Sequence, residues 1–429
     1  DAYEVSQTVF GGHQPPLLIA DFNGDAQLDV AARLRIFPGR GDGTVDAVQT
    51  IASGFGSVDA VAADVNNDGF ADLVTPAGGR IAVTLGHGDG TFETAPQLLL
   101  RSGIGLDRKP TSLALADFNG DGRTDFVAGV RTGTLTGFTT GVAVLMTNSD
   151  GGYASAVDYL LIAQVTDVAT GDVNGDGHAD IVATISPSDF VPGAVAVLLN
   201  TGDGRFGPAQ YLTTSESPRS LLVRDLNGDG AVDIAVHVAG PFDNVTRTFP
   251  NSGIQVFHGI GDGTFSAPAL APAGAGTSSR VDSITAGDLN GDSILDLAVA
   301  AGGLVRTDPA RPTDPPVRVQ DGLYILLGNP DGTYRAGDRY LTDPGGALPV
   351  LASVALGDFN RDGKLDAAAT RTFFPSASDI TEGRTDDLIV LLGNGDGTFG
   401  AATAHDFGRT VGQLLAGDLN GDGTPDLVA

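Results

Sequence analysis

Short apolar segments recur along the whole chain, and clusters of Gly, Asp and Asn separate them. Apolar and small residues alternate in some segments, such as 113–116 and 354–357, whereas others, such as 142–146 and 195–199, are apolar without interruption. Alternation, β-branched residues and turn-forming residues at the boundaries are typical of β-strands. No segment shows a helical period of useful length. The pattern therefore predicts an all-β chain.

Two short polar motifs lie between the predicted strands. A nine-residue motif of the form Asp-x-Asn-x-Asp-x-x-x-Asp occurs eight times, with copies beginning at residues 21, 64, 117, 172, 225, 288, 358 and 418. A shorter motif, Gly-Asp-Gly in most copies, begins at residues 41, 88, 149, 202, 261, 330 and 395; we call it the GDG turn. Internal repeats of this kind form one array rather than several unrelated domains. We therefore interpret residues 1–429 as a single domain.

Each repeat has room for four short strands, and repeated four-stranded sheets are typical of a β-propeller, in which radial closure leaves few free strand edges. Residues 3–10 add one outer strand before the first complete repeat, and residues 414–429 add two strands after the last. The strands are then one short of eight blades of four. We predict an eight-bladed ring whose last blade combines both chain ends, and expect the missing strand to follow residue 429. Seven blades with an irregular closure are the alternative.

Oxygen-bearing side chains occupy alternate positions of the nine-residue motif. Positions 1, 3, 5 and 9 are Asp, Asn, Asp and Asp in every copy, while position 7 varies freely. This set suits a hard cation, to which position 7 would add its backbone carbonyl, and it favours Ca2+ over Mg2+. Metal-free Asx turns are the alternative, but three carboxylates in one loop repel each other without a cation. Repetition of the site in every blade favours a structural role over a catalytic one.

The sequence thus predicts up to eight structural Ca2+ ions. Their expected side-chain ligands are Asp21, Asn23, Asp25, Asp29, Asp64, Asn66, Asp68, Asp72, Asp117, Asn119, Asp121, Asp125, Asp172, Asn174, Asp176, Asp180, Asp225, Asn227, Asp229, Asp233, Asp288, Asn290, Asp292, Asp296, Asp358, Asn360, Asp362, Asp366, Asp418, Asn420, Asp422 and Asp426.

The composition excludes several classes of protein. The formal net charge is −29, with 24 Lys and Arg against 53 Asp and Glu, so we expect no nucleic-acid partner and no attraction to an anionic membrane surface. No apolar run approaches the roughly 18 residues that a membrane-spanning helix needs, so membrane insertion is not expected. The chain has no Cys, which excludes a disulfide framework and a thiolate nucleophile.

The repeats resemble those of a known family. The nine-residue motif, strands such as Val195–Leu199 and turns of the form Gly-Asp-Gly-Thr-Phe are similar to FG-GAP or VCBS-type repeats, found in the propeller of integrin α-subunits and in many secreted bacterial proteins. The resemblance covers essentially the whole chain and implies a calcium-binding propeller. It does not define a function, because such propellers serve as adhesins, lectins and scaffolds, and related ones include polysaccharide lyases. Unlike the integrin pattern, this chain has eight loops and no recognisable inserted adhesion domain.

Blade geometry divides the loops between two faces. The connections between strands 1 and 2 and between strands 3 and 4 share one face, so the nine-residue motifs and the GDG turns are expected there. Insertions lengthen the connections on the opposite face, at residues 131–140, 186–192, 240–252, 301–321 and 372–386. Loops on a rigid scaffold often carry binding residues, although tolerated surface insertions are the alternative.

Arginines accompany the two longest insertions. They are Arg306, Arg311, Arg318, Arg371 and Arg384. Such a cluster can bind carboxylates, as in uronic acids or acidic side chains. The alternative is that these arginines balance nearby aspartates.

We therefore expect a secreted or cell-surface scaffold that binds a protein or glycan partner at the insertion-bearing face, with Ca2+ as a structural ion. The alternative is a calcium-dependent polysaccharide lyase or a lectin-type carbohydrate-active propeller. No unique catalytic constellation occurs, and the chain lacks Trp for stacking on sugars, so no catalytic residue is assigned. A location outside the cytoplasm follows from the calcium concentration that extracellular sites require. The first residue is Asp1 rather than Met, which suits a mature chain whose signal segment is not shown.

Overall fold

The structure of the chain is a computed structural model. It describes residues 9–10, 17–32, 35–46, 49–50, 60–77, 80–94, 98–99, 108–134, 137–149, 152–187, 192–240, 252–271, 281–301, 305–306, 317–318, 322–341, 349–373, 387–406 and 412–429. Within these ranges the secondary structure consists of strands and turns, and no helix is long and apolar enough to cross a membrane.

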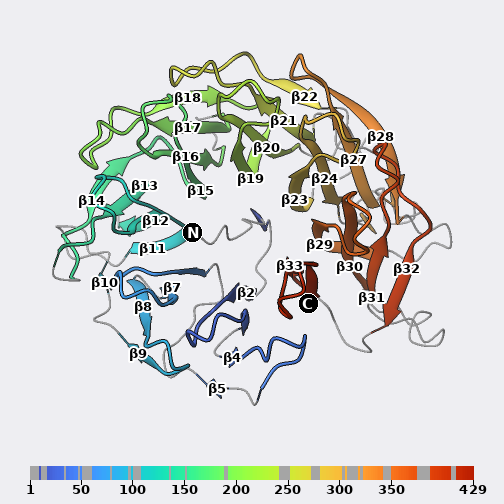
Figure 1. Cartoon of the computed structure of the whole chain (residues 1–429). Helices are drawn as coiled ribbons and strands as arrows, with labels where there is room; N and C mark the ends of the chain where they lie inside the picture. The colour runs from blue at the N-terminus through green and yellow to red at the C-terminus, as the bar shows by residue number, and fades with distance from the viewer. Residues whose placement is uncertain are drawn as a thin grey trace.

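In the described part of the chain, seven antiparallel sheets of four or five strands are arranged around a central axis and form a β-propeller (Figure 1). The first blade consists of β2 (Leu17–Ala20), β3 (Asp29–Ala32), β4 (Arg35–Phe37) and β5 (Gln49–Thr50). The second consists of β6 (Val61–Ala63), β7 (Asp72–Ala77), β8 (Arg80–Gly86), β9 (Phe92–Thr94) and β10 (Leu98–Leu99). The third consists of β11 (Arg108–Ala116), β12 (Asp125–Thr134), β13 (Gly137–Leu145) and β14 (Val157–Leu160).

The fourth and fifth blades consist of β15 (Val165–Gly171), β16 (Asp180–Ile185), β17 (Ala194–Leu198) and β18 (Gln210–Thr213), and of β19 (Ser217–Arg224), β20 (Asp233–Ala239), β21 (Gly253–Phe257) and β22 (Ala269–Ala271). The sixth blade consists of β1 (Val9–Phe10), β23 (Val281–Gly287), β24 (Asp296–Ala301), β27 (Gly322–Gly328) and β28 (Tyr334–Tyr340). The seventh consists of β29 (Pro349–Gly357), β30 (Asp366–Phe373), β31 (Asp387–Leu391) and β32 (Thr403–Asp406).

Two further pairs of strands stand outside these seven sheets. The strands β25 (Val305–Arg306) and β26 (Val317–Arg318) pair within the connection between β24 and β27. The strands β33 (Leu415–Gly417) and β34 (Asp426–Val428) pair with each other, and we call them the C-terminal hairpin. This hairpin contacts β29 of the last blade and β2 of the first, so it lies between them in the ring.

The number of blades matches the alternative prediction, seven, and the predicted eight-bladed ring is not confirmed. The C-terminal hairpin supplies a first and a second strand, as expected. The predicted role of the N-terminal strand is wrong for its described part, because Val9 and Phe10 pair with Ile284 and Ser283 of β23. A fourth strand pairs with the third strand of its blade, and the described part of the C-terminal hairpin contains no third strand for β1 to join. Residues 3–8 lie outside the described residues.

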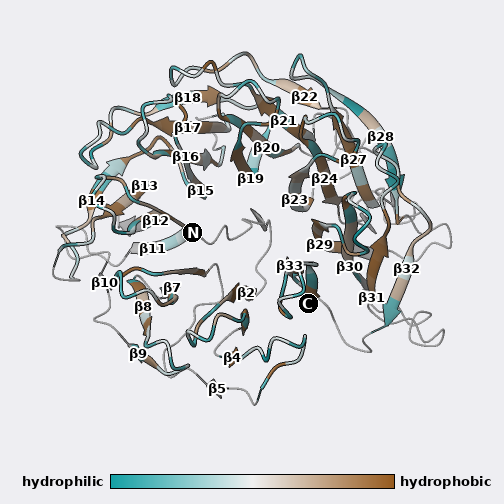
Figure 2. Cartoon of the chain, viewed as in Figure 1, coloured by the Kyte–Doolittle hydropathy of each residue, from teal (hydrophilic) through white to brown (hydrophobic). Residues whose placement is uncertain are grey.

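The hydrophobic core lies in layers between neighbouring blades. In β12, Phe126 packs toward the second blade, in a cluster with Ile81, whereas the next residue, Val127, packs toward the fourth blade, in a cluster with Ile181. Successive residues of a strand point to opposite faces of a sheet, so a middle strand with a blade on either side is apolar at every position. This arrangement explains the uninterrupted apolar segments of the sequence, which appear as brown strands in the middle of the blades (Figure 2).

Hydrogen bonds join the innermost strands of neighbouring blades. The N–H of Leu414 donates to Ser353 Oγ of the seventh blade (3.1 Å). The N–H of Leu17 in the first blade donates in turn to Gln413 Oε1 (2.7 Å). Ser353 and Gln413 each stand five residues before a nine-residue motif, so they occupy equivalent positions. The side chain of Gln413 therefore closes the ring between the C-terminal hairpin and the first blade.

Candidate metal centres

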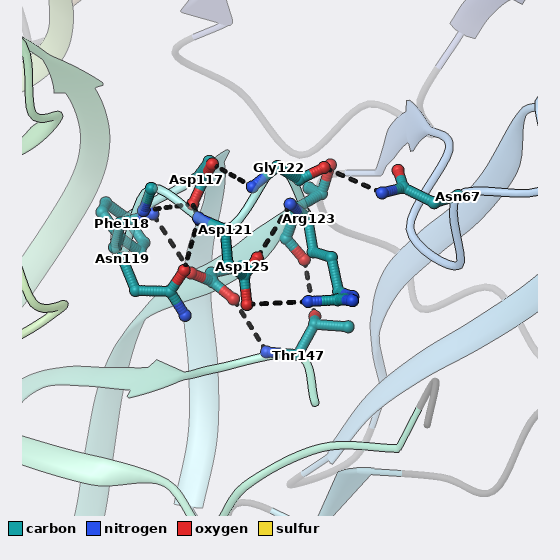
Figure 3. Close-up of polar contacts among 11 residues, drawn as sticks. Asn67, Asp117, Phe118, Asn119, Asp121, Gly122, Arg123, Asp125 and Thr147 are labelled. Carbon is teal, nitrogen blue, oxygen red and sulfur yellow. Dashed lines mark hydrogen bonds and ion pairs between the residues drawn. The ribbon is translucent and has the colours of Figure 1, made fainter. Parts of the chain in front are cut away.

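Each nine-residue motif forms the loop between the first and second strands of a blade or of the C-terminal hairpin. In the third blade, Asp117 Oδ1 accepts hydrogen bonds from the N–H groups of Gly120 (2.7 Å) and Asp121 (3.1 Å), as Figure 3 shows. Asn119 Oδ1 also accepts from the N–H of Asp121 (2.9 Å), and Asp121 Oδ1 accepts from that of Arg123 (2.9 Å). The loop therefore turns its carboxylate and amide oxygens toward its own backbone.

The same geometry recurs in every copy. In all eight loops the Oδ2 atom of position 1 accepts the N–H of position 6 at 2.7–2.9 Å. The Oδ1 atom of position 5 accepts the N–H of position 7 at 2.8–3.0 Å. The bond from position 5 to the N–H two residues on is the one that the metal-free Asx alternative requires. A carboxylate oxygen has two lone pairs, so the same oxygens can also coordinate a cation.

Position 6 takes a left-handed backbone conformation even where the residue is not Gly. Ala26 has a φ of 65° and Ser293 a φ of 69°, although L-residues rarely adopt positive φ values. The hydrogen bond from the N–H of position 6 to position 1 is kept in both loops. The shape of the loop is therefore set by its aspartates as well as by its glycines.

The ninth position anchors each loop to its blade. Asp125 is fully buried, its Oδ2 accepts the N–H of Phe118 (3.1 Å), and its Oδ1 accepts the N–H of Thr147 just after the third strand (2.7 Å), as Figure 3 shows. All seven complete blades repeat this pair of contacts. The GDG turns therefore lie at the same end of the blades as the nine-residue loops, as the blade geometry predicted.

Burial disfavours the ionised form of five carboxylates at the ninth position. Loss of water raises the pKa of each to about 6, against the opposing effect of the two N–H donors. The nearby carboxylates of positions 1 and 5 raise the pKa further. These five residues are Asp29, Asp72, Asp125, Asp180 and Asp296.

The donor set of each loop fits Ca2+ in chemistry, since it consists only of oxygen atoms. The side chains do not converge as a finished site, because no group of three or more Asp, Glu or His residues in the described part of the chain is close enough to hold a metal ion. The predicted ligands of one loop are thus held on a single tight turn, with their oxygens directed at backbone amides. Neighbouring loops also contact each other, through position 4 in two copies, and these contacts were not predicted from the sequence.

The predicted arginine cluster is only partly described. Val305 pairs with Arg318 and Arg306 with Val317, so the backbones of Arg306 and Arg318 lie side by side on the β25–β26 ribbon. Arg371 lies in β30 and is partly buried. Arg311 and Arg384 lie outside the described residues, so the cluster remains a prediction.

Comparisons with known proteins identify the repeats. The chain matches the FG-GAP-like repeat over residues 21–75, 73–128, 172–236, 243–299 and 378–429, and the FG-GAP repeat over residues 110–156. Comparison with curated proteins gives no match.

Solved structures resemble the chain at low sequence identity. A lectin of Agrocybe aegerita that recognises non-reducing terminal N-acetylglucosamine is 18% identical, with a TM-score of 0.47 over 97% of this chain and 85% of the lectin. The periplasmic gluconolactonase of Pseudomonas aeruginosa is 16% identical, with a TM-score of 0.47 over 98% of each chain. The repeat matches span more than half of the sequence, and the chain therefore belongs to the FG-GAP-like repeat family.

Proposed function

We propose that this chain is a secreted or cell-surface β-propeller that Ca2+ stabilises and that binds a protein or glycan ligand without catalysing a reaction. The observation that carries the proposal is the eightfold repetition of one loop geometry, with three carboxylates on each nine-residue turn. Repeated carboxylates of this kind add charge repulsion at every blade. A protein gains nothing from that repulsion unless a cation offsets it.

The ninth carboxylate supplies the link between the ion and the fold. In the seven complete blades it is buried and bonded to backbone on both sides, and in five of them burial raises its pKa. A bound Ca2+ would supply the missing positive charge and favour the ionised form. The residues that would hold the ion are the side chains of positions 1, 3, 5 and 9 and the carbonyl of position 7.

The face opposite the loops is the proposed ligand-binding face. At that face β12 and β13 continue as a paired ribbon up to Thr134 and Gly137, and the β25–β26 ribbon follows the end of β24. Both ribbons are connections between a second and a third strand. Ribbons on a rigid ring can present side chains to a partner with little loss of conformational freedom.

Metal binding is tested with a matched pair of variants in the fourth blade. Asp176→Asn changes position 5 of the nine-residue loop, and Asp203→Asn changes the GDG turn of the same blade; both carboxylates accept a backbone N–H two residues on. In equilibrium dialysis with metal analysis, we expect Asp176→Asn to bind one Ca2+ fewer than the wild type and Asp203→Asn to bind the same number. Absence of bound Ca2+ from the wild type would refute the metal part of the proposal.

Ligand binding is tested with an array of glycans and surface proteins in the presence of calcium. We expect selective binding that is weakened when residues of the β25–β26 ribbon are replaced by alanine. The same incubation with acidic polysaccharides is followed for unsaturated products. Release of such products would overturn the non-catalytic part of the proposal and favour a lyase.

A further inference from the structure

Position 4 of the nine-residue loop separates two copies from the rest. It is Gly in six loops, but Asn67 in the second and Arg361 in the seventh. Both residues have left-handed backbones, with φ values of 60° and 62°. This conformation costs energy for any residue with a Cβ atom and none for Gly. Ala26 and Ser293 also have left-handed backbones, so Asn67 and Arg361 stand apart through what their side chains contact.

Both side chains reach the loop of the following blade. The Nδ2 group of Asn67 donates to the carbonyl oxygen of Gly122, position 6 of the third loop (2.8 Å). Arg361 contacts the eighth loop, in the C-terminal hairpin. Its Nη2 pairs with Asp422 Oδ1 (2.6 Å) and donates to the carbonyl oxygen of Asp422 (2.7 Å), while its Nε donates to Thr424 Oγ1. The Asn67 bridge is neutral, whereas the Arg361 bridge brings a positive charge.

The carboxylate that Arg361 contacts is a predicted metal ligand. Asp422 is position 5 of the eighth loop, and its Oδ1 also accepts the N–H of Thr424 (2.8 Å). In the third loop Arg123 also contacts the carboxylate of position 5, through a single hydrogen bond to Asp121 Oδ2 (3.0 Å). Arg123 belongs to the loop whose carboxylate it contacts, whereas Arg361 makes three contacts with a neighbouring loop.

The ninth position of the eighth loop repeats one of the two backbone contacts that the other loops make. Asp426 Oδ2 accepts the N–H of Leu419 (3.0 Å), as the ninth position does in every loop. In the seven complete blades a residue after the third strand donates to the other oxygen, but the described part of the C-terminal hairpin has no third strand. Asp426 is accordingly only partly buried.

We propose that Arg361 supplies the positive charge of the eighth loop in place of a metal ion and fastens the C-terminal hairpin to the seventh blade. The eighth loop then binds Ca2+ more weakly than the loops of the complete blades. A positive charge paired with a carboxylate that would coordinate a divalent ion repels that ion, so it lowers the affinity of the loop for Ca2+. The comparison with the other loops rests on the proposed calcium binding, whereas the fastening of the hairpin does not.

Hydrogen exchange followed by mass spectrometry resolves individual loops. It therefore tests both the weaker Ca2+ binding of the eighth loop and the fastening of the C-terminal hairpin. The variant Arg361→Gly restores the residue of the other loops and relieves the left-handed strain, so it should fold. Arg361→Gln removes the charge but keeps the side chain. Asn67→Gly is the matched control, because it removes a bridge from the same loop position without removing a charge.

Without calcium, we expect residues 418–426 to exchange at least several-fold faster in both Arg361 variants than in the wild type, and unchanged in Asn67→Gly. Addition of CaCl2 should protect residues 172–180 in the wild type but leave 418–426 unchanged, and should protect 418–426 in Arg361→Gly. Equal calcium protection of the two loops in the wild type, or unchanged calcium-free exchange in the Arg361 variants, would overturn the inference. If calcium protects no loop in any variant, the proposed function fails, and the calcium-free comparison alone decides whether Arg361 fastens the hairpin.

Discussion

Acidification should stabilise the calcium-free protein, which is the reverse of ordinary acid denaturation. Burial raises the pKa of Asp29, Asp72, Asp125, Asp180 and Asp296 to about 6. An acid whose pKa is raised by folding takes up its proton first in the native state. The free energy of unfolding therefore rises as the pH falls from 7 through 6 toward 5.

The expected size of the effect follows from the same values. A rise from 3.8 to about 6 corresponds to at most about 3 kcal/mol for each carboxylate, since one pKa unit is ~1.4 kcal/mol. We take about 1 kcal/mol each, because water around the exposed part of the loop screens the charges, and so about 5 kcal/mol for the five residues. His237 acts in the opposite direction, because its burial lowers its pKa to about 3, and it costs about 2 kcal/mol at pH 5.

The net gain of about 3 kcal/mol should raise the melting temperature by roughly 3 °C for a chain of this length. The aspartates of the GDG turns do not interfere, because their pKa values are lowered and their contribution is lost only at more acidic pH. The measurement is a series of thermal melts in EDTA at pH 7, 6 and 5, with a parallel series in CaCl2. Calcium should abolish the rise, since it holds the carboxylates ionised. A calcium-free melting temperature that falls steadily from pH 7 to pH 5 would refute the reasoning.

Three further perturbations have defined outcomes. His237 is fully buried, and neither ring nitrogen has a hydrogen-bond partner among the described residues. His237→Phe should therefore increase the free energy of unfolding by about 2 kcal/mol at pH 5 and less at pH 7, as urea unfolding at the two pH values will show. Tyr159→Phe removes the hydroxyl that accepts the N–H of Phe206 (3.1 Å) and should cost about 1 kcal/mol, whereas an unchanged urea midpoint would show that water replaces the bond. Gln413→Leu leaves the N–H of Leu17 without its acceptor and should lower the free energy of unfolding by about 1–2 kcal/mol. Hydrogen exchange should become faster only in β2 and the C-terminal hairpin, and faster exchange in all blades would contradict ring closure by Gln413.

The local parts of the fold could be predicted because each motif specifies its own geometry. The aspartates of the nine-residue motif cap their own backbone, and the apolar runs indicate strands covered on both faces. The partner of the N-terminal strand could not be predicted in this way, since Val9 pairs with Ile284, far along the chain. The contacts between neighbouring loops had one indication in the sequence, because Asn67 and Arg361 occupy a position that is Gly in the other six copies. Metal binding and the ligand-binding face remain predictions.

The layers of core between blades determine the smallest unit that can fold. Each cluster takes side chains from two neighbouring blades, as Phe126 and Val127 of one strand illustrate, so a blade alone would leave both apolar faces in water. A linear repeat array can lose an end repeat and keep the remaining interfaces. In a closed ring, removal of one repeat exposes two faces and also breaks the Gln413 contact or its equivalent. Duplication or loss of a single repeat should therefore destabilise this protein strongly. Sequence variation is expected instead in the connections between second and third strands.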